Sequence, residues 1–132
     1  MSNKVKIAID AMGGEGSPKK ILDGIEISLK TNNDNFFYLY GDEKILKEEV
    51  LKRKSLTNFC EIISCKDAIL DDESPLSAAK KSKETSMWKA IDSLKENKSD
   101  ISLSAGNTGA LLVISRLLLN TIEGINKPAL AA

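Results

Sequence analysis

The sequence has no histidine, only two cysteines and few aromatic residues, and each shortage excludes a kind of chemistry. Aromatic side chains make up 5% of its 132 residues. Without histidine there is no His-activated nucleophile, no His general base and no His metal ligand. Cys60 and Cys65 match no metal-binding or redox spacing, so we expect two reduced core thiols and no metal site.

The chain also lacks an excess of charge of one sign and a long apolar segment. Nineteen basic residues balance nineteen acidic ones, so no net field attracts anionic lipid or nucleic acid, and we expect no nucleic-acid partner. The longest nearly apolar run, residues 110–119, is interrupted by Ser115 and Arg116 and is half the roughly 20 residues that a bilayer-spanning helix needs. No signal-peptide hydrophobic region precedes the first strand-like segment, so we expect a cytoplasmic protein.

What the sequence does contain is the composition of one soluble domain and an alternation of strand-like and helical segments. Apolar residues make up 42% and charged residues 29%, and we assign residues 1–132 to a single α/β domain. The pattern predicts strands at residues 5–10, 35–40, 59–64, 100–104 and 128–132. It predicts helices that begin at Ser17-Pro18, with Ser17 as N-cap, after Gly41-Asp42, at Ser74-Pro75, at Thr85 or Ser86, and at Asn107. This alternation is typical of a doubly wound, Rossmann-like α/β fold, a mostly parallel sheet with helices on both faces.

The end of the sequence leads us to expect a truncated portion of a longer fold, and the alternative is a frayed tail. Residues 128–132 stop within an apolar segment, so a fifth strand there would have no helix after it. In the predicted helix 107–120, leucine and isoleucine cover most of the circumference, so this helix needs burial in the core or at a contact between subunits. With half of the fold absent, part of that surface is exposed, and we expect the chain to self-associate.

Two strand-to-helix loops are rich in glycine, at residues 10–18 and 104–110. All such loops of a parallel sheet lie at the same edge, where ligands bind near the switch in strand order. Glycine lets backbone N–H groups approach an anion, and the following helix adds its unpaired N–H groups, so the two loops suggest a phosphate-sized pocket. Neither loop is a P-loop or a complete dinucleotide fingerprint, and the alternative is that the glycines only form tight turns.

Side chains in and near these loops have a structural and a functional interpretation. Asn107 and Thr108 stand where residues cap a helix, yet both also supply neutral donors for a phosphate oxygen or a developing oxyanion. Asp10 at the end of the first strand could orient a ligand or fix its own turn. A run of lysines that includes Lys81 could add positive charge at this edge or form a solvated helix face.

Four segments, taken together, resemble signatures of the bacterial phosphate acyltransferases of phospholipid synthesis (PlsX). Residues 9–18 resemble the opening signature of that family, and residues 104–112 and 124–130 resemble its second and third. Residues 81–87 fall where the family has a Lys/Ser-Ser-Met segment. The departures are Glu15 for aspartate, Thr85 for serine and Lys127 for arginine. The resemblance covers all 132 residues but only the front part of the family's length.

The resemblance implies transfer of a long-chain acyl group from acyl carrier protein to inorganic phosphate, which gives acyl phosphate. Phosphate is itself the nucleophile, so the absence of histidine does not hinder this reaction, and no cofactor is implied. The implied partners are acyl carrier protein, a second subunit in a homodimer, and a membrane glycerol-3-phosphate acyltransferase that takes the product. The full-length family member is implied to be cytoplasmic, with peripheral association with the membrane.

The resemblance also assigns roles to particular residues. Backbone N–H groups of the loop glycines would bind phosphate, Asn107 and Thr108 would be side-chain donors, and Asp10 would be an orienting carboxylate. The expected phosphate- or substrate-binding residues are Gly13, Gly14, Gly106, Ser104, Lys81 and Ser86. Two alternatives stay open: a catalytically inactive fragment or subunit of this fold, and a phosphotransacetylase-like enzyme that prefers a coenzyme A thioester.

Overall fold

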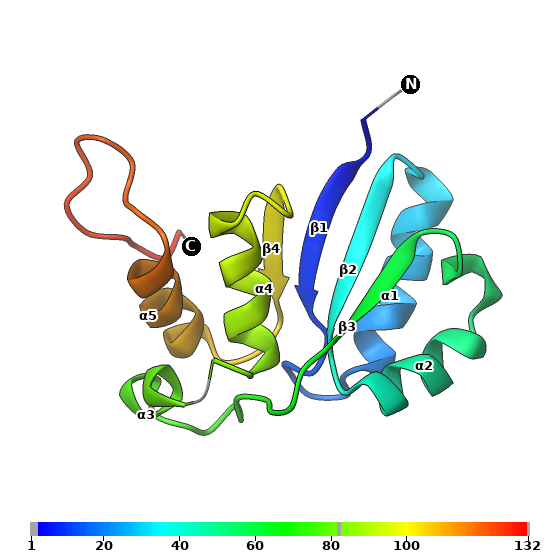
Figure 1. Ribbon diagram of the computed structural model, residues 1–132, viewed down its shortest axis with the longest axis horizontal. Coiled ribbons are helices and arrows are strands. Elements are labelled where there is room, and N and C mark those ends of the chain that lie inside the picture. Colours follow the sequence, from blue (N-terminus) through cyan, green and yellow to red (C-terminus); the bar gives the residue numbers. More distant parts are fainter. Residues whose placement is uncertain (1–2, 82, 132) are drawn as a thin grey trace.

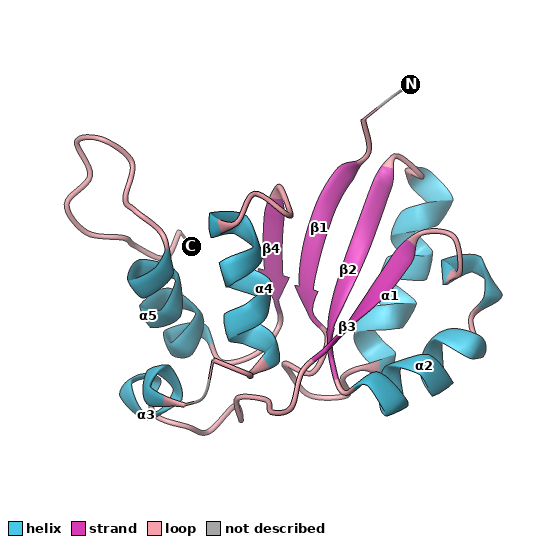
Figure 2. Cartoon of the chain, viewed as in Figure 1, coloured by secondary structure: helices cyan, strands magenta, loops and turns pink. Residues whose placement is uncertain are grey.

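The computed structural model describes residues 3–81 and 83–131, which form one four-stranded parallel sheet with helices on both faces (Figure 1 and Figure 2). The strands are β1 (Val5–Asp10), β2 (Asn35–Gly41), β3 (Cys60–Ser64) and β4 (Ile101–Ser104). The helices are α1 (Lys19–Thr31), α2 (Glu43–Leu51), α3 (Pro75–Lys80), α4 (Ser86–Lys95) and α5 (Thr108–Leu118), with a 3-10 turn η1 (Lys54–Leu56). The predicted doubly wound α/β fold is confirmed.

The order of the strands is β3-β2-β1-β4, so β1 lies inside the sheet between β2 and β4. The chain first adds β2 and β3 on one side of β1, then crosses back and adds β4 on the other side. Asp10 at the end of β1 is in register with Tyr40 of β2 and with Ser104 of β4. The direction of winding therefore reverses between β1 and β4.

Alternation along β1 divides the core between the two faces of the sheet. Ile9 packs with Leu22 of α1 and Leu39 of β2 in a cluster whose leucines are completely buried. On the opposite face, the small side chain of Ala8 lets Ala90 of α4 approach the sheet closely. β1 therefore has an aliphatic face and a small-residue face.

Beside the sheet, α3, α4 and α5 share a second apolar core. Its buried residues are Ile69, Ala78, Met87, Ile91, Ala110 and Ile114. α5 packs mainly against α3 and α4, and its outer side is open, with Leu117 61% exposed. This agrees with the expected partial exposure of the helix, while self-association stays a prediction.

Four helices have the side-chain caps that the sequence predicts, but α1 does not. The side chains of four residues each accept a hydrogen bond from a backbone N–H in the first turn of the following helix: Asp42, Ser74, Thr85 and Asn107. The prediction that Ser17 caps α1 is wrong: the helix begins at Lys19, and the position before it makes no side-chain cap. The reason is that the Ser17 hydroxyl donates back to the Gly13 carbonyl oxygen at 2.5 Å, inside the first glycine-rich loop.

The predicted fifth strand is also wrong for residues 128–131, which form no strand, and residue 132 lies outside the described residues. A strand there would have to reach the free edge of β4. Instead, the segment after α5 folds back beside that helix (Figure 1). Arg116 Nη1 donates to the carbonyl oxygen of Asn126 at 3.2 Å, and a turn closes from the N–H of Ile125 to the oxygen of Ile122 at 2.9 Å.

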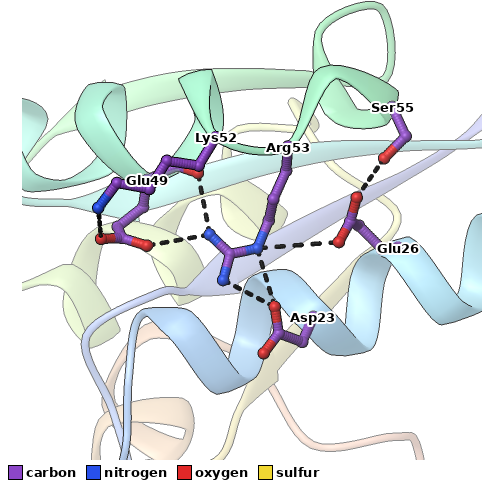
Figure 3. A network of polar contacts seen from close by, with 6 residues as sticks. All are labelled: Asp23, Glu26, Glu49, Lys52, Arg53 and Ser55. Carbon is purple, nitrogen blue, oxygen red and sulfur yellow. Dashed lines mark hydrogen bonds and ion pairs between the residues drawn. The ribbon is translucent and has the colours of Figure 1, made fainter.

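On the other side of the molecule, Arg53 ties α1 to α2 (Figure 3). Its guanidinium group donates to Asp23 Oδ1 at 2.8 Å and to Glu49 Oε2 at 3.0 Å, and Glu49 also accepts from Lys52 at 2.7 Å. Glu26 completes the network, with its Oε2 3.8 Å from Arg53 Nε. Hydrogen bonds from Lys52 and Arg53 hold the pKa of Glu49 below its usual range.

Candidate functional site

The carboxyl ends of β1 and β4 meet at the point where the sheet reverses its winding. Both glycine-rich loops leave from this point: one leads from Asp10 to α1, and the other leads from Ser104 to α5. In open α/β sheets, ligands bind in the crevice outside the carboxyl ends of the strands at such a switch point. The fold therefore brings the two predicted loops together at the edge where a ligand is expected.

Asp10 is the centre of this site and is 2% exposed. Its Oδ1 accepts a hydrogen bond from Ser86 Oγ at 2.6 Å, and its Oδ2 accepts one from Ser104 Oγ at 2.8 Å. The N–H of Met12 donates to Oδ1 at 3.3 Å, so Asp10 also fixes its own turn. Ser104 Oγ in turn accepts from the N–H of Gly106 at 3.1 Å. One buried carboxylate thus joins β1, α4, β4 and the second glycine-rich loop.

The two glycine-rich loops touch, and this contact leaves no room for side chains. A Cβ atom at Gly13 would lie 2.5 Å from Asp10 Oδ2 and 3.1 Å from the Gly106 Cα atom. Gly14 has a φ of +90°, and a Cβ atom there would lie 2.6 Å from the carbonyl oxygen of Ala105. Close packing therefore requires glycine at these positions. The glycines thus serve the tight geometry of the loops, whether or not they also bind a ligand.

Four backbone N–H groups in and just after the two glycine-rich loops have no acceptor among the described residues. Within residues 3–81 and 83–131, the N–H groups of Gly13, Gly14, Thr108 and Gly109 donate no hydrogen bond to another residue. Thr108 is exposed and is the first residue of α5, where the helix dipole favours an anion. The arrangement offers an anion several N–H donors and one hydroxyl.

Asn107 is placed beside this site, but its amide is already bonded at both ends. Oδ1 accepts from the N–H of Ala110 at 3.0 Å and so caps α5. Nδ2 donates to the carbonyl oxygens of Leu70, Asp71 and Glu73 at 3.2, 3.4 and 2.7 Å. The capping interpretation of Asn107 is thus observed. The loop that it binds had no signal in the sequence, because its partners lie more than thirty residues away along the chain.

Lys81 also contacts this loop rather than the glycine-rich loops. Its Nζ atom pairs with Glu73 Oε1 at 2.6 Å and donates to the carbonyl oxygen of Ala68 at 3.1 Å. Glu73 Oε1 accepts in addition from the N–H of Leu70 at 2.9 Å. The hydrogen bonds from Lys81 and Leu70 hold the pKa of Glu73 below its usual range, and Glu73 raises the pKa of Lys81.

Of the predicted residues, the structure brings together Asp10, Ser86, Ser104 and the three loop glycines in direct contact. Asn107 and Thr108 continue from the second loop, and Lys81 connects to Asn107 only through Glu73 and its neighbours. The residue that the sequence reasoning missed is Glu73, which joins Lys81 to the loop bound by Asn107. An acidic residue in a loop just before Ser74-Pro75 resembles any solvated turn, so no local pattern marks it.

Neither cysteine has the environment of a nucleophile. Both thiols are free, and burial raises the pKa of Cys65 to about 11 and raises the pKa of Cys60. In the described part of the chain, no three His, Cys, Asp or Glu side chains gather as metal ligands would. No helix among these residues has both the length and the apolar character to cross a bilayer.

Comparison with known proteins identifies the family. The model of a family described as "Fatty acid synthesis protein" matches residues 5–132, a range that contains all four signature-like segments. The chain belongs to this family. It is 53% identical over 132 residues to a protein of Pelagibacter ubique named "Phosphate acyltransferase", and it covers 39% of that relative. Relatives with the same name from Rhodopseudomonas palustris and Roseobacter denitrificans are 39% and 37% identical.

These relatives match all or nearly all of the chain, 100% and 97% respectively, but the chain spans only 38% and 36% of their lengths. The resemblance to phosphate acyltransferases is confirmed. The loops described above therefore lie in a region that this chain shares with much longer proteins.

Proposed function

We propose that the protein to which this chain belongs transfers a long-chain acyl group from acyl carrier protein to inorganic phosphate, giving acyl phosphate for phospholipid synthesis. Family membership and the relatives named phosphate acyltransferase support an acyltransferase. The observation that carries the phosphate site is the meeting of two glycine-rich loops at the β1–β4 switch point, with unbonded N–H groups beside the start of α5.

In this reaction a phosphate oxygen attacks the carbonyl carbon of the acyl thioester. The carbon–sulfur bond then breaks, and the carrier-protein thiolate leaves with the electron pair. The protein has to hold the phosphate and stabilise the oxyanion, which positioning and preorganised donors achieve without an enzyme nucleophile. This fits a chain without histidine whose cysteines are buried or raised in pKa.

We assign the donor role to the N–H groups of Gly13 and Gly14, to the first turn of α5 beside Gly106, and to the Thr108 hydroxyl. Asp10 is the orienting carboxylate, because its bonds to Ser86 and Ser104 hold both loops in place. Removal of one preorganised oxyanion donor lowers turnover by about a hundredfold to a thousandfold in other enzymes, which sets the scale expected for the strongest of these donors.

The remaining assignments follow from the family resemblance and not from a contact in the structure. They are acyl carrier protein as donor, a homodimer, a cytoplasmic location with peripheral membrane association, and a membrane glycerol-3-phosphate acyltransferase as consumer of the product. Lys81 and Asn107 belong to the same proposed site, and replacement of Asn107 by alanine should lower turnover of the full-length enzyme by about tenfold or more. Unchanged turnover would remove Asn107 from the site.

The deciding experiment uses purified full-length protein with acyl-loaded carrier protein. We expect loss of the thioester that depends on added phosphate, and a product that hydroxylamine traps as a hydroxamate. Sulfate at equal ionic strength is the control, and it should not support the reaction. A clear preference for a coenzyme A thioester would favour a phosphotransacetylase-like enzyme instead, and no turnover by a folded full-length protein would favour a non-catalytic subunit.

A further inference from the structure

The first turn of α5 depends on the segment that precedes and forms α3. α5 packs mainly against α3 and α4. Gly109 in its first turn lies so close to Pro75, the first residue of α3, that a Cβ atom would not fit between them. The amide of Asn107 adds hydrogen bonds from this turn to the loop at residues 70–73. The direction in which the first turn presents its N–H groups is therefore set by this loop.

The loop at residues 70–73 is itself braced into one shape. Glu73 Oε1 accepts from the N–H of Leu70 at 2.9 Å, and the N–H of Glu73 donates to the carbonyl oxygen of Leu70 at 3.2 Å. Lys81 Nζ forms an ion pair with Glu73 Oε1 at 2.6 Å. Ile69, which is only 5% exposed, packs in the second apolar core and so anchors the beginning of the loop. This bracing directs three carbonyl oxygens of the loop at one nitrogen atom of Asn107.

We propose that Asn107 is a positioning residue that acts through this loop and does not itself donate to the phosphate. Its Nδ2 hydrogens are taken up by loop carbonyl oxygens, and its Oδ1 caps α5, so the side chain has no donor left for a ligand. These hydrogen bonds fix the first turn of α5 beside Gly106. Glu73 is a second positioning residue, because it braces the loop that Asn107 binds. This inference rests on the phosphate site proposed above.

Asn107→Ser and Glu73→Ala distinguish a positioning role from direct contact with the phosphate and from helix capping alone. Asn107→Ser keeps a good N-cap but removes the donor to the loop, whereas Asn107→Ala removes both. Glu73→Ala loosens the loop without touching α5, and it also deletes a negative charge. If only charge mattered, Glu73→Ala would strengthen phosphate binding, but if the loop positions α5, Glu73→Ala weakens it. Asn120→Ser, at an exposed position after α5, is the matched control.

The measurement is the affinity of the full-length protein for inorganic phosphate, followed by the backbone amide signals of Gly13, Gly14 and Gly106 in NMR titrations. Sulfate at equal ionic strength serves as reference. We expect Asn107→Ser and Glu73→Ala each to weaken phosphate binding about fivefold or more, the worth of one hydrogen bond, with Asn120→Ser unchanged. The melting temperature of Asn107→Ser should stay near that of the parent protein, because the cap remains.

Each other result overturns a different statement. If Asn107→Ser weakens binding while Glu73→Ala leaves it unchanged or strengthens it, Asn107 contacts the phosphate directly and the positioning role is wrong. If neither substitution changes an affinity that the parent protein does show, Asn107 only caps α5. If the parent protein shows no phosphate-specific shifts at the loop glycines, the proposed phosphate site itself fails, and the positioning role fails with it.

Discussion

The two sides of this molecule are built in different ways. On the side of α1 and α2, large leucines with no exposed surface fill the core, and Arg53 joins the two helices through three carboxylates (Figure 3). On the side of α4 and α5, glycine, alanine and serine bring backbones close together around Asp10, and apolar side chains such as Leu117 remain exposed. Large buried leucines fill the core of the first side, and the second side carries the candidate site next to its own apolar core. Exposed apolar side chains occur on both sides, such as Leu51 on α2 and Leu117 on α5.

This difference follows from what each side has to do. A ligand site at a switch point needs backbone N–H groups within reach, which large side chains would prevent, so close packing there relies on small residues. Around Asp10, small side chains bury little apolar area, so stabilisation has to come from the larger buried side chains of the two apolar cores. The comparison can be tested by matched substitutions on the two sides.

The largest expected contrast is between two leucines. Leu22→Ala, on α1, removes a completely buried side chain and should lower the free energy of unfolding by about 2–5 kcal/mol. Leu117→Ala, on α5, removes a side chain that is 61% exposed and should change it by less than about 0.5 kcal/mol. Urea denaturation measures both. An equal loss for the two variants would mean that α5 is covered in solution, as self-association would produce.

Two glycine-to-alanine substitutions, one on each side, should change the free energy of unfolding in opposite directions. Gly13→Ala would force a Cβ atom against Asp10 and Gly106, and should cost about 1–3 kcal/mol of unfolding free energy. Gly24→Ala, inside α1, places its Cβ atom where no other atom lies within 4 Å, and should gain about 0.5–1 kcal/mol. Thermal unfolding distinguishes the two. A stabilised Gly13→Ala variant would show that the loops do not touch in solution.

The difference between the sides also explains which features the sequence could reveal. The four strands and the caps at Asp42 and Thr85 depend on neighbouring residues, so alternation and local capping rules located them. The carboxyl ends of parallel strands all lie at the same edge of the sheet, and this rule predicts the edge at which the two glycine-rich loops meet. These local and topological rules were enough for the fold class and for the meeting of the two glycine-rich loops at one edge of the sheet.

The errors and omissions arise where a side chain finds a distant or competing partner. Ser17 was predicted to cap α1, but its hydroxyl donates a hydrogen bond to the carbonyl oxygen of Gly13 instead. A strand at residues 128–132 was predicted, but strand formation needs a neighbouring edge, and the described residues 128–131 form no strand. Just before them, Asn126 accepts a hydrogen bond from Arg116 of α5. The partners of Asn107 in the loop at residues 70–73 are contacts of the same long-range kind. None of these partners can be read from a window of sequence.

The smallest expected effect concerns pH and the ion pairs of the α1–α2 side. Because hydrogen bonds from Lys52 and Arg53 lower the pKa of Glu49, the folded state binds that proton less readily than the unfolded chain does. The stabilisation from Glu49 is then complete above the pKa of the unfolded chain, near 4.5, and is lost as the pH falls through the lower folded value. Glu49→Gln should therefore flatten the acid side of the stability profile.

The matched control for this prediction is Glu48→Gln, since Glu48 is the exposed neighbour whose carboxylate lies 3.9 Å from Lys52. Urea titrations at several pH values between about 3 and 7 measure the slope, which linkage ties to the difference in bound protons between the folded and unfolded states. We expect Glu48→Gln to leave the slope nearly unchanged, because an exposed pair contributes little. If both variants flatten the profile equally, the buried position of Glu49 beside Arg53 gives it no larger role than the exposed position of Glu48.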